Sequence, residues 1–224
     1  MIWRIPIRLL QRALAPDWEV IRGRIESECA RLASSPELAP STSMQRLLVS
    51  GEDHRHGRHP GFDPIAIGRA LWRRLSRGSH EGASTIEQQI VRVITNRYER
   101  SIARKIREIL LAILVADRYP KHILPGVYLA IGYYGWRMNG YDQARRRLGL
   151  SPHCATLHDA ARLVARLKYP QPRDTWVLRL AQIDRRAKHL CALYRRHATD
   201  GTYGYLDGPT VRNRSAPLKP VPQS

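Results

Sequence analysis

Residues 101–118 carry apolar side chains at intervals of three and four positions, a spacing that predicts an amphipathic helix. The apolar face is formed by Ile102, Ile106, Ile109, Leu110 and Ile113. Arg104 and Glu108 lie on the opposite face, and Lys105 precedes the glutamate by three residues. Taken alone, this charged group indicates an ion pair on a solvated face, worth about 0.3–0.5 kcal/mol. The same arrangement would also suit a site that holds an anionic leaving group.

Helical signals recur along most of the chain, and convincing alternating strand patterns are nearly absent. Asp63 followed by Pro64 predicts an N-cap with proline at the first helical position. Ser84 and Glu87 have the spacing of a capping box. Helices are predicted at residues 18–34, 63–78, 84–96, 101–118, 159–168 and 174–197, with a short apolar element at residues 44–49. Together these predictions describe a mainly α fold.

The 224 residues suffice for one domain with a sizeable core. We expect a basic amphipathic segment and helix at residues 1–43, the main domain at residues 44–206 and a mobile tail at residues 207–224. Lys and Arg total 38 against 19 Asp and Glu, so the formal charge of +19 favours nucleic acid, anionic lipid or a phosphorylated substrate as partner. The cysteines show no metal-binding spacing and imply no disulfide framework: Cys29, Cys154 and Cys191.

The first sixteen residues combine basic and apolar positions. Arg4, Arg8 and Arg12 recur every four residues between isoleucines, leucines and a tryptophan. They interrupt the apolar run that a signal peptide needs, and no stretch of the chain is long enough for a transmembrane helix. The pattern predicts a short basic helix, with Pro6 tolerated only near its start. Such a helix would lie on an anionic membrane surface or dock on the domain's own core, and the two alternatives are equally supported.

Three local patterns follow one another in the chain and can be read together. They are Glu52-Asp53-x-x-His56-x-x-His59-x-Gly61-x-Asp63, then Gly82-x-Ser84-Thr85-Ile86-x-Gln88-Gln89, then Arg104-Lys105-x-x-Glu108. A fourth, weaker pattern includes Lys121, Tyr128 and Leu129, followed by Tyr133-Tyr134-Gly135. In these residues the chain resembles the glycosyltransferase domain of peptidoglycan polymerases, glycosyltransferase family 51, which includes monofunctional transglycosylases and class A penicillin-binding proteins. The resemblance covers about residues 48–172.

The resemblance implies an enzyme that polymerises lipid II, a disaccharide-pentapeptide lipid, into glycan strands. The family joins the C4 hydroxyl of an acceptor sugar to C1 of a donor chain, and undecaprenyl pyrophosphate leaves. The implied fold has a lysozyme-like larger lobe and a small membrane-facing lobe, and no nucleotide cofactor is used. The implied location is peripheral, on the outer face of the cytoplasmic membrane. The implied partners are lipid II, the growing glycan strand, the anionic membrane surface and other cell-wall synthesis proteins.

The residue types suit this chemistry. A hydroxyl nucleophile needs a general base, and Glu52 matches the family's base. A pyrophosphate leaving group needs fixed positive charge, which Arg104 and Lys105 would supply, with Arg92 where the family usually has lysine. Glu108, the second catalytic carboxylate, would orient the donor phosphate region. Because a carboxylate repels pyrophosphate, either a bridging divalent cation (Mg²⁺ or Mn²⁺, with Glu108 as metal ligand) or the flanking cations must compensate.

The remaining motif residues divide into two groups. Those expected to bind substrate are Ser84, Thr85, Gln88, Gln89 and Lys121. Those expected to be structural are Asp53, His59, Gly61 and Asp63. Ser84 has a second interpretation as a simple helix cap, and Asp63 is well explained as an N-cap. The histidines at 54, 56 and 59 do not have a recognised zinc spacing.

The sequence also departs from the family's pattern. His56 replaces a phenylalanine beside the base, Val93 replaces an asparagine, and Gly126 and Ala130 replace a glutamate and an asparagine in the fourth pattern, where Pro125 is expected to interrupt a helix. These changes leave a rival interpretation open, a catalytically weak module that binds lipid-linked glycan. A glycoside hydrolase with paired carboxylates is a further alternative, although the Arg-Lys-x-x-Glu cluster suits phosphate better. A nucleic-acid binder is disfavoured, since only the net charge supports it.

Overall fold

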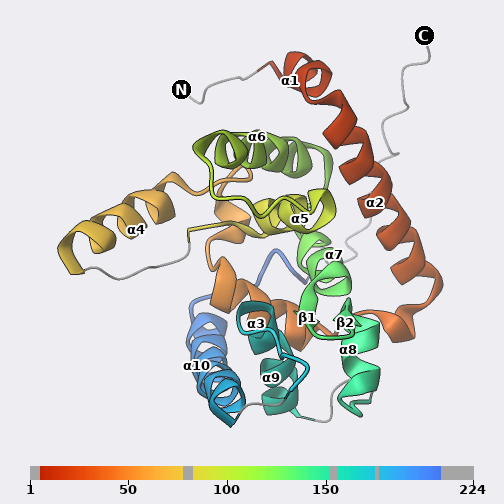
Figure 1. Cartoon of the computed structure of the whole chain (residues 1–224), viewed down its shortest axis with the longest axis vertical. Coiled ribbons are helices and arrows are strands. Elements are labelled where there is room, and N and C mark those ends of the chain that lie inside the picture. Colours follow the sequence, from red (N-terminus) through yellow and green to blue (C-terminus); the bar gives the residue numbers. More distant parts are fainter. Residues whose placement is uncertain (1–5, 78–82, 152–155, 175–176, 208–224) are drawn as a thin grey trace.

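The computed structural model of the chain describes residues 6–77, 83–151, 156–174 and 177–207. The fold is mainly α, as the sequence predicts (Figure 1). The helices are α1 (Ile7–Ala13), α2 (Ala15–Ser34), α3 (Thr42–Glu52), α4 (Pro64–Arg77), α5 (Ile86–Thr95), α6 (Ile102–Arg118), α7 (Leu124–Ile131), α8 (Tyr141–Arg147), α9 (Leu157–Lys168) and α10 (Val177–Thr199). Short 3₁₀ turns occur at Pro36–Leu38 and His56–Arg58. Strands β1 (Tyr133–Gly135) and β2 (Met138–Asn139) form a small antiparallel hairpin.

Helix α7 is the innermost element, and all eight of its residues are buried. A helix that is apolar all round can be stable only when other elements surround it. Helices α2, α3 and α5 pack against it, and α9 and α10 pack on each other and on α3. In Figure 1 the group formed by α3, α9 and α10 occupies the lower half of the molecule, α1 and α6 lie at the top, and α4 projects to one side.

The expected interruption at Pro125 does not occur. Pro125 lies in the first turn of α7, where its missing N–H has no partner to lose, and the helix runs on to Ile131. Gly126 also lies within the helix, and a Cβ atom built on it would come no closer than 3.7 Å to Gln45. The structure therefore leaves room for a Cβ atom at this position.

The face that helix α6 buries differs from the face that the sequence predicts. Ile102 and Ile106, on the predicted apolar face, are 81% and 54% exposed, whereas Glu108 is only 3% exposed. The buried face is formed by Glu108, Leu111, Ala112, Leu114 and Val115. The ion pair is therefore not on a solvated face. The carboxylate can be buried because several cations from two helices contact it, as described below.

The N-terminal helix α1 packs on the core through Leu10 and through Leu14, the residue that ends the helix. Both side chains are buried. Arg8 and Arg12 are exposed, and Pro6 immediately precedes the helix, as expected. Arg4 lies outside the described residues. Docking on the core is thus confirmed, and it leaves the basic face open. In the described part of the chain, no helix has both the length and the apolar character needed to cross a bilayer.

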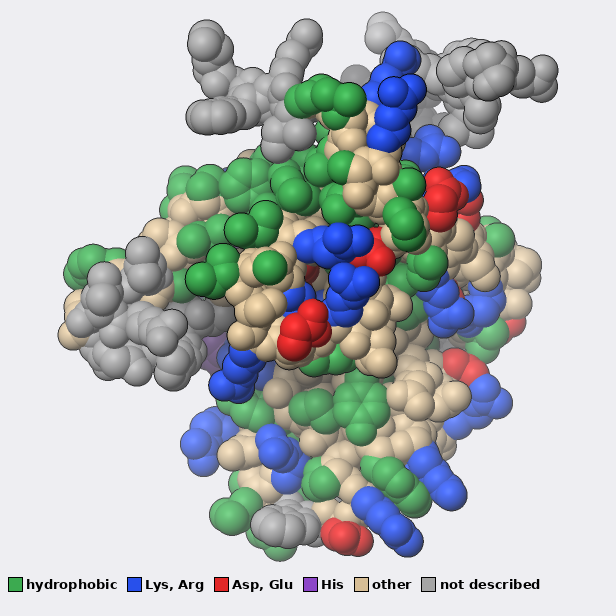
Figure 2. Space-filling model, turned by 45° about the horizontal axis from the view of Figure 1, so that its top comes forward, with side chains coloured by type: hydrophobic (Ala, Val, Ile, Leu, Met, Phe, Trp, Pro, Cys, Tyr) green, Lys and Arg blue, Asp and Glu red, His purple; other side chains and the backbone are tan. Residues whose placement is uncertain are grey.

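Exposed apolar side chains gather at one end of the molecule. They lie on α1, α4 and α6, which are grouped at the top and side of Figure 1, and Figure 2 shows this face with its hydrophobic side chains. The residues are Leu9, Ile65, Ile67, Trp72, Ile102 and Ile106. Monomeric soluble proteins rarely leave such a surface open without a partner.

The segment after α10 returns to the core. Tyr203 is buried and its hydroxyl lies 2.5 Å from the Ser50 hydroxyl on α3, while Asp207 pairs with Arg46 at 2.5 Å. The expected mobile tail, apart from Asp207, lies outside the described residues. Residues 200–207 are therefore held against α3 by these contacts.

Candidate active site

A cleft of about 720 Å³ opens between α3, α4, α5 and α10. Its lining includes seven Lys or Arg residues and three acidic ones. The cations are Arg58, Arg69, Arg73, Arg92, Lys168, Arg186 and Arg196, and the acids are Glu52, Asp53 and Asp200. His54 and His197 stack on each other across the cleft with ring centroids 5.6 Å apart. A concave surface with this excess of positive charge attracts anionic ligands.

Glu52 is the last residue of α3 and reaches into this cleft. Arg186 Nη2 donates to its Oε1 at 3.0 Å, and Gln89 Nε2 donates to its Oε2 at 3.3 Å. The Tyr128 hydroxyl donates in turn to Gln89 Oε1, which fixes the orientation of the amide. Burial, together with the charge of Glu52, raises the pKa of Tyr128, so this hydroxyl stays protonated. The side chain of Glu52 remains 21% exposed and can meet a ligand.

Arg186 is a site residue that the sequence did not reveal. It lies on α10, 134 residues beyond Glu52. It also donates to the backbone carbonyl of Gly51 at 2.7 Å. A Cβ on Gly51 would lie 2.3 Å from Leu190 and 2.9 Å from Arg186, so glycine permits α10 to approach. The only local signal is an arginine next to Ala187 and three residues after Ile183, on the buried face of a long helix.

The loop after Glu52 is tied to the start of α5. Asp53 accepts a hydrogen bond from the backbone N–H of Ile86 at 3.1 Å and lies 3.0 Å from His59 Nε2. The Thr85 hydroxyl donates to the carbonyl of Gly61 at 2.7 Å. Gly61 has φ of +96°, a conformation that only glycine adopts readily, and a Cβ there would clash with the α6 backbone. These four motif residues therefore hold the loop in place.

Asp63 and Thr85 cap helices. Asp63 accepts from the N–H groups of Ile65 and Ala66 at 2.9 and 3.2 Å, which confirms it as the cap of α4. Thr85, not Ser84, is the N-cap of α5, and its side chain accepts from the N–H of Gln88. The capping-box prediction is therefore wrong by one residue, and this leaves the Ser84 hydroxyl available for the site.

Ser84 lies on the cleft wall between two cations. Its Oγ accepts from Arg92 Nη2 at 3.2 Å and from Lys105 Nζ at 3.1 Å. Lys105 also donates to Gln88 Oε1 at 2.5 Å. Arg92 donates to both Ser84 and Glu108, so Ser84 connects the open cleft to the buried charges behind it.

Glu108 accepts hydrogen bonds from three cations. Arg92 binds it with two, each 2.9 Å long, Lys105 Nζ adds one at 2.8 Å, and Arg104 adds another. Burial alone would raise the pKa of Glu108, but the hydrogen bonds from Arg92 and Lys105 outweigh it and the pKa is lowered. One negative charge faces three positive ones, so the cluster keeps an excess of two positive charges. Such an excess behind the cleft wall favours an anion in front of it.

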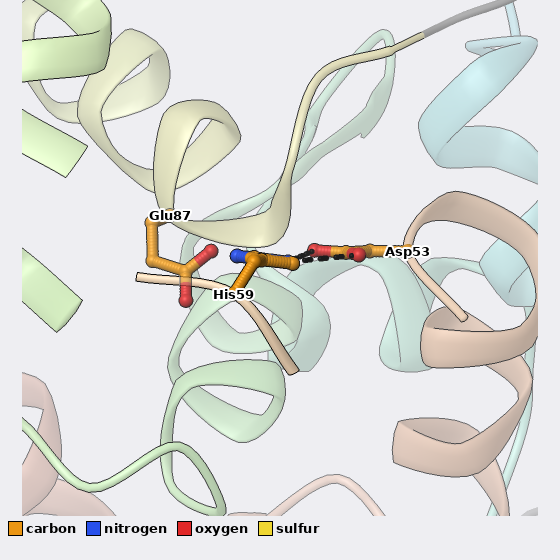
Figure 3. Close-up of side chains that lie close together, drawn as sticks. All are labelled: Asp53, His59 and Glu87. Atoms are coloured by element: carbon orange, nitrogen blue, oxygen red, sulfur yellow. Dashed lines mark hydrogen bonds and ion pairs between the residues drawn. The ribbon is translucent and has the colours of Figure 1, made fainter. Parts of the chain in front are cut away.

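The metal ion expected at Glu108 does not fit this donor set. A carboxylate offers about four lone-pair positions, and four N–H donors already occupy both oxygens of Glu108. Another group could hold a metal ion, because donor atoms of Asp53, His59 and Glu87 lie within 4.8 Å of one another (Figure 3). There, however, His59 already faces Asp53 and the Lys121 ammonium pairs with Glu87.

Glu87 is fully buried and accepts from the ammonium of Lys121. His56 Nε2 lies 3.1 Å from Glu87, and His56 Nδ1 lies 2.8 Å from the hydroxyl of Tyr205. Burial alone would raise the pKa of Glu87, but the contacts with His56 and Lys121 lower it to about 2. The polar His56 that replaces an expected phenylalanine is thus hydrogen-bonded to Tyr205, and its second ring nitrogen lies close to Glu87 without forming a hydrogen bond.

The structure brings only part of the predicted site into the cleft. Glu52, Ser84, Gln89 and Arg92 line it directly. Gln88, Lys105 and Glu108 form the layer behind Ser84 and Arg92. Arg104 reaches the same Glu108 from the far side, where it lines a small cavity of about 10 Å³. Thr85 caps its helix and Lys121 pairs with Glu87, so neither lines the cleft.

Comparison with known sequences is consistent with these features. Residues 22–194 match the transglycosylase family. The chain is 35% identical over 164 residues to a biosynthetic peptidoglycan transglycosylase of Xylella fastidiosa, covering 69% of this chain and 65% of that protein. It is 32% identical over 136 residues to one of Thiobacillus denitrificans, covering 59% and 57%.

A third relative is a larger protein. The chain is 39% identical over 98 residues to penicillin-binding protein 1A of Vibrio cholerae, covering 43% of this chain and 12% of that protein. In each of these three relatives, the chain spans less than two thirds of the length. The family match nevertheless covers most of the present chain, and the motif residues of the cleft lie within it. The chain belongs to the transglycosylase family, the peptidoglycan glycosyltransferases of family 51.

Proposed function

We propose that this chain polymerises lipid II into glycan strands and releases undecaprenyl pyrophosphate. The observation that carries the proposal is the placement of Glu52, held by Arg186 and Gln89, in the same cleft as Ser84 and Arg92. One side of the cleft thus offers a carboxylate that can accept a proton, and the other offers fixed positive charge. Glycosyl transfer from a pyrophosphate donor to a hydroxyl needs both.

The reaction would start at Glu52. Each of its oxygens accepts one protein hydrogen bond, so lone pairs remain for the C4 hydroxyl of the acceptor sugar. Glu52 takes the hydroxyl proton as the oxygen forms a bond to C1 of the donor. The bond between C1 and the pyrophosphate oxygen breaks, and its electron pair leaves with the pyrophosphate. Arg92 and Lys105, whose positive charge exceeds that of Glu108, would stabilise the charge that develops there.

Glu108 has a positioning role in this proposal. It binds Arg92, Lys105 and Arg104 at once, and so holds their side chains in one geometry before substrate arrives. Because these cations already compensate its charge, we propose that the reaction does not require Mg²⁺ or Mn²⁺ at Glu108. Activity that survives chelation by EDTA would support this, and activity restored only by added metal would contradict it.

The apolar end formed by α1, α4 and α6 supports a membrane-facing lobe. Lipid II has a long hydrocarbon tail, so its polymerase must work at a bilayer surface. The exposed side chains there, together with Arg8 and Arg12, suit peripheral binding to anionic lipid on the outer face of the cytoplasmic membrane. Removing residues 1–16 should weaken binding to anionic vesicles, and unchanged binding would reject α1 as an anchor.

A second function is favoured by one observation, the loss of two polar residues in α7. Gly126 and Ala130 stand where the family has glutamate and asparagine, and both are buried in α7, the helix whose Tyr128 contacts Gln89. If these losses abolish turnover, the chain would be a module that binds lipid-linked glycan without polymerising it.

The test uses the purified chain with lipid II in detergent or vesicles, followed by separation of polymer from monomer. The native chain should form polymer, and Glu52→Gln should form at least about 100-fold less, since general-base catalysis contributes about 10²–10⁴-fold. The matched control is Glu37→Gln, an exposed carboxylate on the surface, which should behave like the native chain. Glycan binding without polymer from any protein would support the binding module. Salt-sensitive DNA binding without affinity for lipid II would reject both.

A further inference from the structure

A tryptophan on the β1–β2 hairpin is surrounded by guanidinium groups. The Cζ atoms of Arg137, Arg147 and Arg173 lie 4.5, 4.6 and 5.4 Å from a ring centroid of Trp136. The three arginines come from the hairpin, from α8 and from the segment after α9, and all three are exposed. We call these four residues the arginine–tryptophan cluster. None of its members belongs to the motifs that define the candidate active site.

The backbone sets the cluster in place. The N–H of Trp136 donates to the carbonyl of Gln171 at 2.8 Å, and the N–H of Gln171 donates to the carbonyl of Tyr134 at 3.0 Å. A Cβ on Gly135 would lie 2.2 Å from the Gln171 carbonyl oxygen, so the hairpin and this segment are in close contact. Arg137 has φ of +55°, a left-handed conformation that is uncommon for arginine. Such strain persists only where the surroundings fix it, and it is concentrated at binding sites.

The three guanidinium groups are not neutralised. Within the described ranges, none of them forms an ion pair with a carboxylate. The nearby Asp142 pairs with Arg145 and Arg146. Guanidinium groups that stack on an aromatic ring keep their N–H donors available at the edge and are weakly hydrated. Three like charges held together repel one another, and a ligand with several carboxylates or phosphates would relieve that repulsion.

A second hollow lies beside the active-site cleft and reaches the hairpin that carries Trp136 and Arg137. This hollow, about 210 Å³ in volume, shares Gln89 and Arg92 with the cleft and is bounded on its other side by Tyr133 and Pro170. Tyr133, on the same hairpin as Trp136, is 47% exposed. The tyrosine rings of this hollow offer flat apolar faces with polar edges, which suit a sugar ring. A polymer that leaves the cleft through this hollow would pass the hairpin that carries the cluster.

The position of the cluster argues against a lipid headgroup as its ligand. Figure 1 shows β1, β2 and α8 in the lower part of the molecule, away from α1 and α6, whose exposed apolar side chains form the proposed membrane-facing end. A polymer that leaves the cleft away from the bilayer would meet the cluster, whereas the bilayer itself would not. The polymer of the proposed reaction carries a peptide with free carboxylates on each repeat.

We propose that the arginine–tryptophan cluster binds the peptide carboxylates of the growing glycan strand as it leaves the cleft. This inference rests on the proposed function for the identity of the strand, and on the hairpin geometry for the site. Its consequence is that the cluster retains the strand between successive additions, so that it influences strand length and not the rate of a single addition.

The binding test does not depend on turnover. Labelled glycan fragments that carry stem peptides are titrated with protein at about physiological salt, and the same fragments are used after enzymatic removal of the peptides. The test variant combines Arg137→Gln, Arg147→Gln and Arg173→Gln. The control combines Arg185→Gln, Lys188→Gln and Arg195→Gln, three exposed cations on α10 that do not line the cleft.

The test variant should bind peptide-bearing fragments about tenfold more weakly than the native chain and the control, since three exposed ion pairs are lost. Peptide-free fragments should bind all three proteins equally weakly. Equal affinity of test variant and native chain for peptide-bearing fragments would overturn the proposal. So would an equal loss for peptide-free fragments, or a loss of affinity only for phosphatidylglycerol vesicles.

Polymerisation gives a second measurement. With lipid II as substrate, the test variant should consume monomer at the native initial rate but produce shorter strands. Trp136→Leu keeps the three charges and removes the ring on which they stack. It should therefore also give shorter strands than the native chain. Native strand length in the test variant would overturn the proposal. If the native chain forms no polymer, the proposed function fails, while the fragment titration still decides whether the cluster binds peptide carboxylates.

Discussion

The buried carboxylate of Glu87 allows a quantitative test of how the core is held together. Its pKa is lowered from 4.5 to about 2, and the residue is fully buried between Lys121 and His56. A group whose pKa is lowered on folding stabilises the folded state above its unfolded pKa. This stabilisation is lost as the pH falls through the folded pKa. The difference between 4.5 and about 2 corresponds to about 3 kcal/mol.

The perturbation is Glu87→Gln, which keeps the shape and removes the charge. Unfolding by urea, followed by far-UV circular dichroism, gives the free energy of unfolding of both proteins at several pH values. Near neutral pH the variant should be less stable than the native chain by about 3 kcal/mol. This difference should shrink as the pH falls below about 4.5 and should be mostly lost at about pH 2, where about half of the native glutamate is protonated.

The control is Glu19→Gln, which removes an exposed carboxylate paired with Arg22 on α2. An exposed pair contributes about 0.2–1 kcal/mol, so its effect should be small at every pH. If the stabilities of native chain and Glu87→Gln run parallel from neutral to acid pH, the charge of Glu87 does not stabilise the fold, and the reasoning is refuted. The result would also bear on Lys121, which the sequence motif predicts as a substrate ligand and the structure pairs with Glu87.

Three further predictions concern the site. Glu108→Gln leaves a cluster of cations without its carboxylate and should cost about 3–5 kcal/mol of stability, or about 10 °C in Tm by calorimetry; a Tm close to the native value would contradict the proposed positioning role. Arg186→Met should lower kcat for lipid II polymerisation with little change in KM, because Glu52 loses one of its two donors, and Arg186→Lys should recover part of it; an unchanged kcat would exclude Arg186 from the site. Burial, with the neighbouring charges, lowers the pKa of both His54 and His197 below 6.5, so each opposes folding when protonated and stability should fall as the pH drops below about 6.5. His197→Gln should reduce that loss in urea unfolding, and an identical pH dependence in the variant would contradict it.

Local signals in the sequence predicted most helices but not the faces they bury. Asp63 was predicted as a cap because the cap and its helix are adjacent in the chain. Ser84 and Thr85 are both good capping residues, and sequence spacing could not decide between them. Pro125 was expected to break a helix, because its position within the first turn depends on where the preceding segment ends.

The sequence could not predict the features that depend on contacts between residues far apart in the chain. The burial of Glu108 depends on Arg92, which comes from α5, and no spacing within α6 indicates it. The orientation of Glu52 depends on Arg186, and the position of Arg186 depends on how α10 packs on α3. The motif resemblance nevertheless singled out Glu52, Glu108 and all three cations that contact Glu108.

The return of the chain to the core after α10 has a consequence for synthesis. Tyr203 contacts Ser50, and Tyr205 contacts His56 in the turn that follows Glu52. A Cβ on Gly57 would lie 2.9 Å from the Tyr205 ring, so the two segments touch closely. The segment after α10 therefore packs on the loop that follows Glu52, although 149 residues separate His56 from Tyr205 in the chain. This contact can form only after residue 205 has been translated, so a shorter nascent chain lacks this support for the loop that follows Glu52.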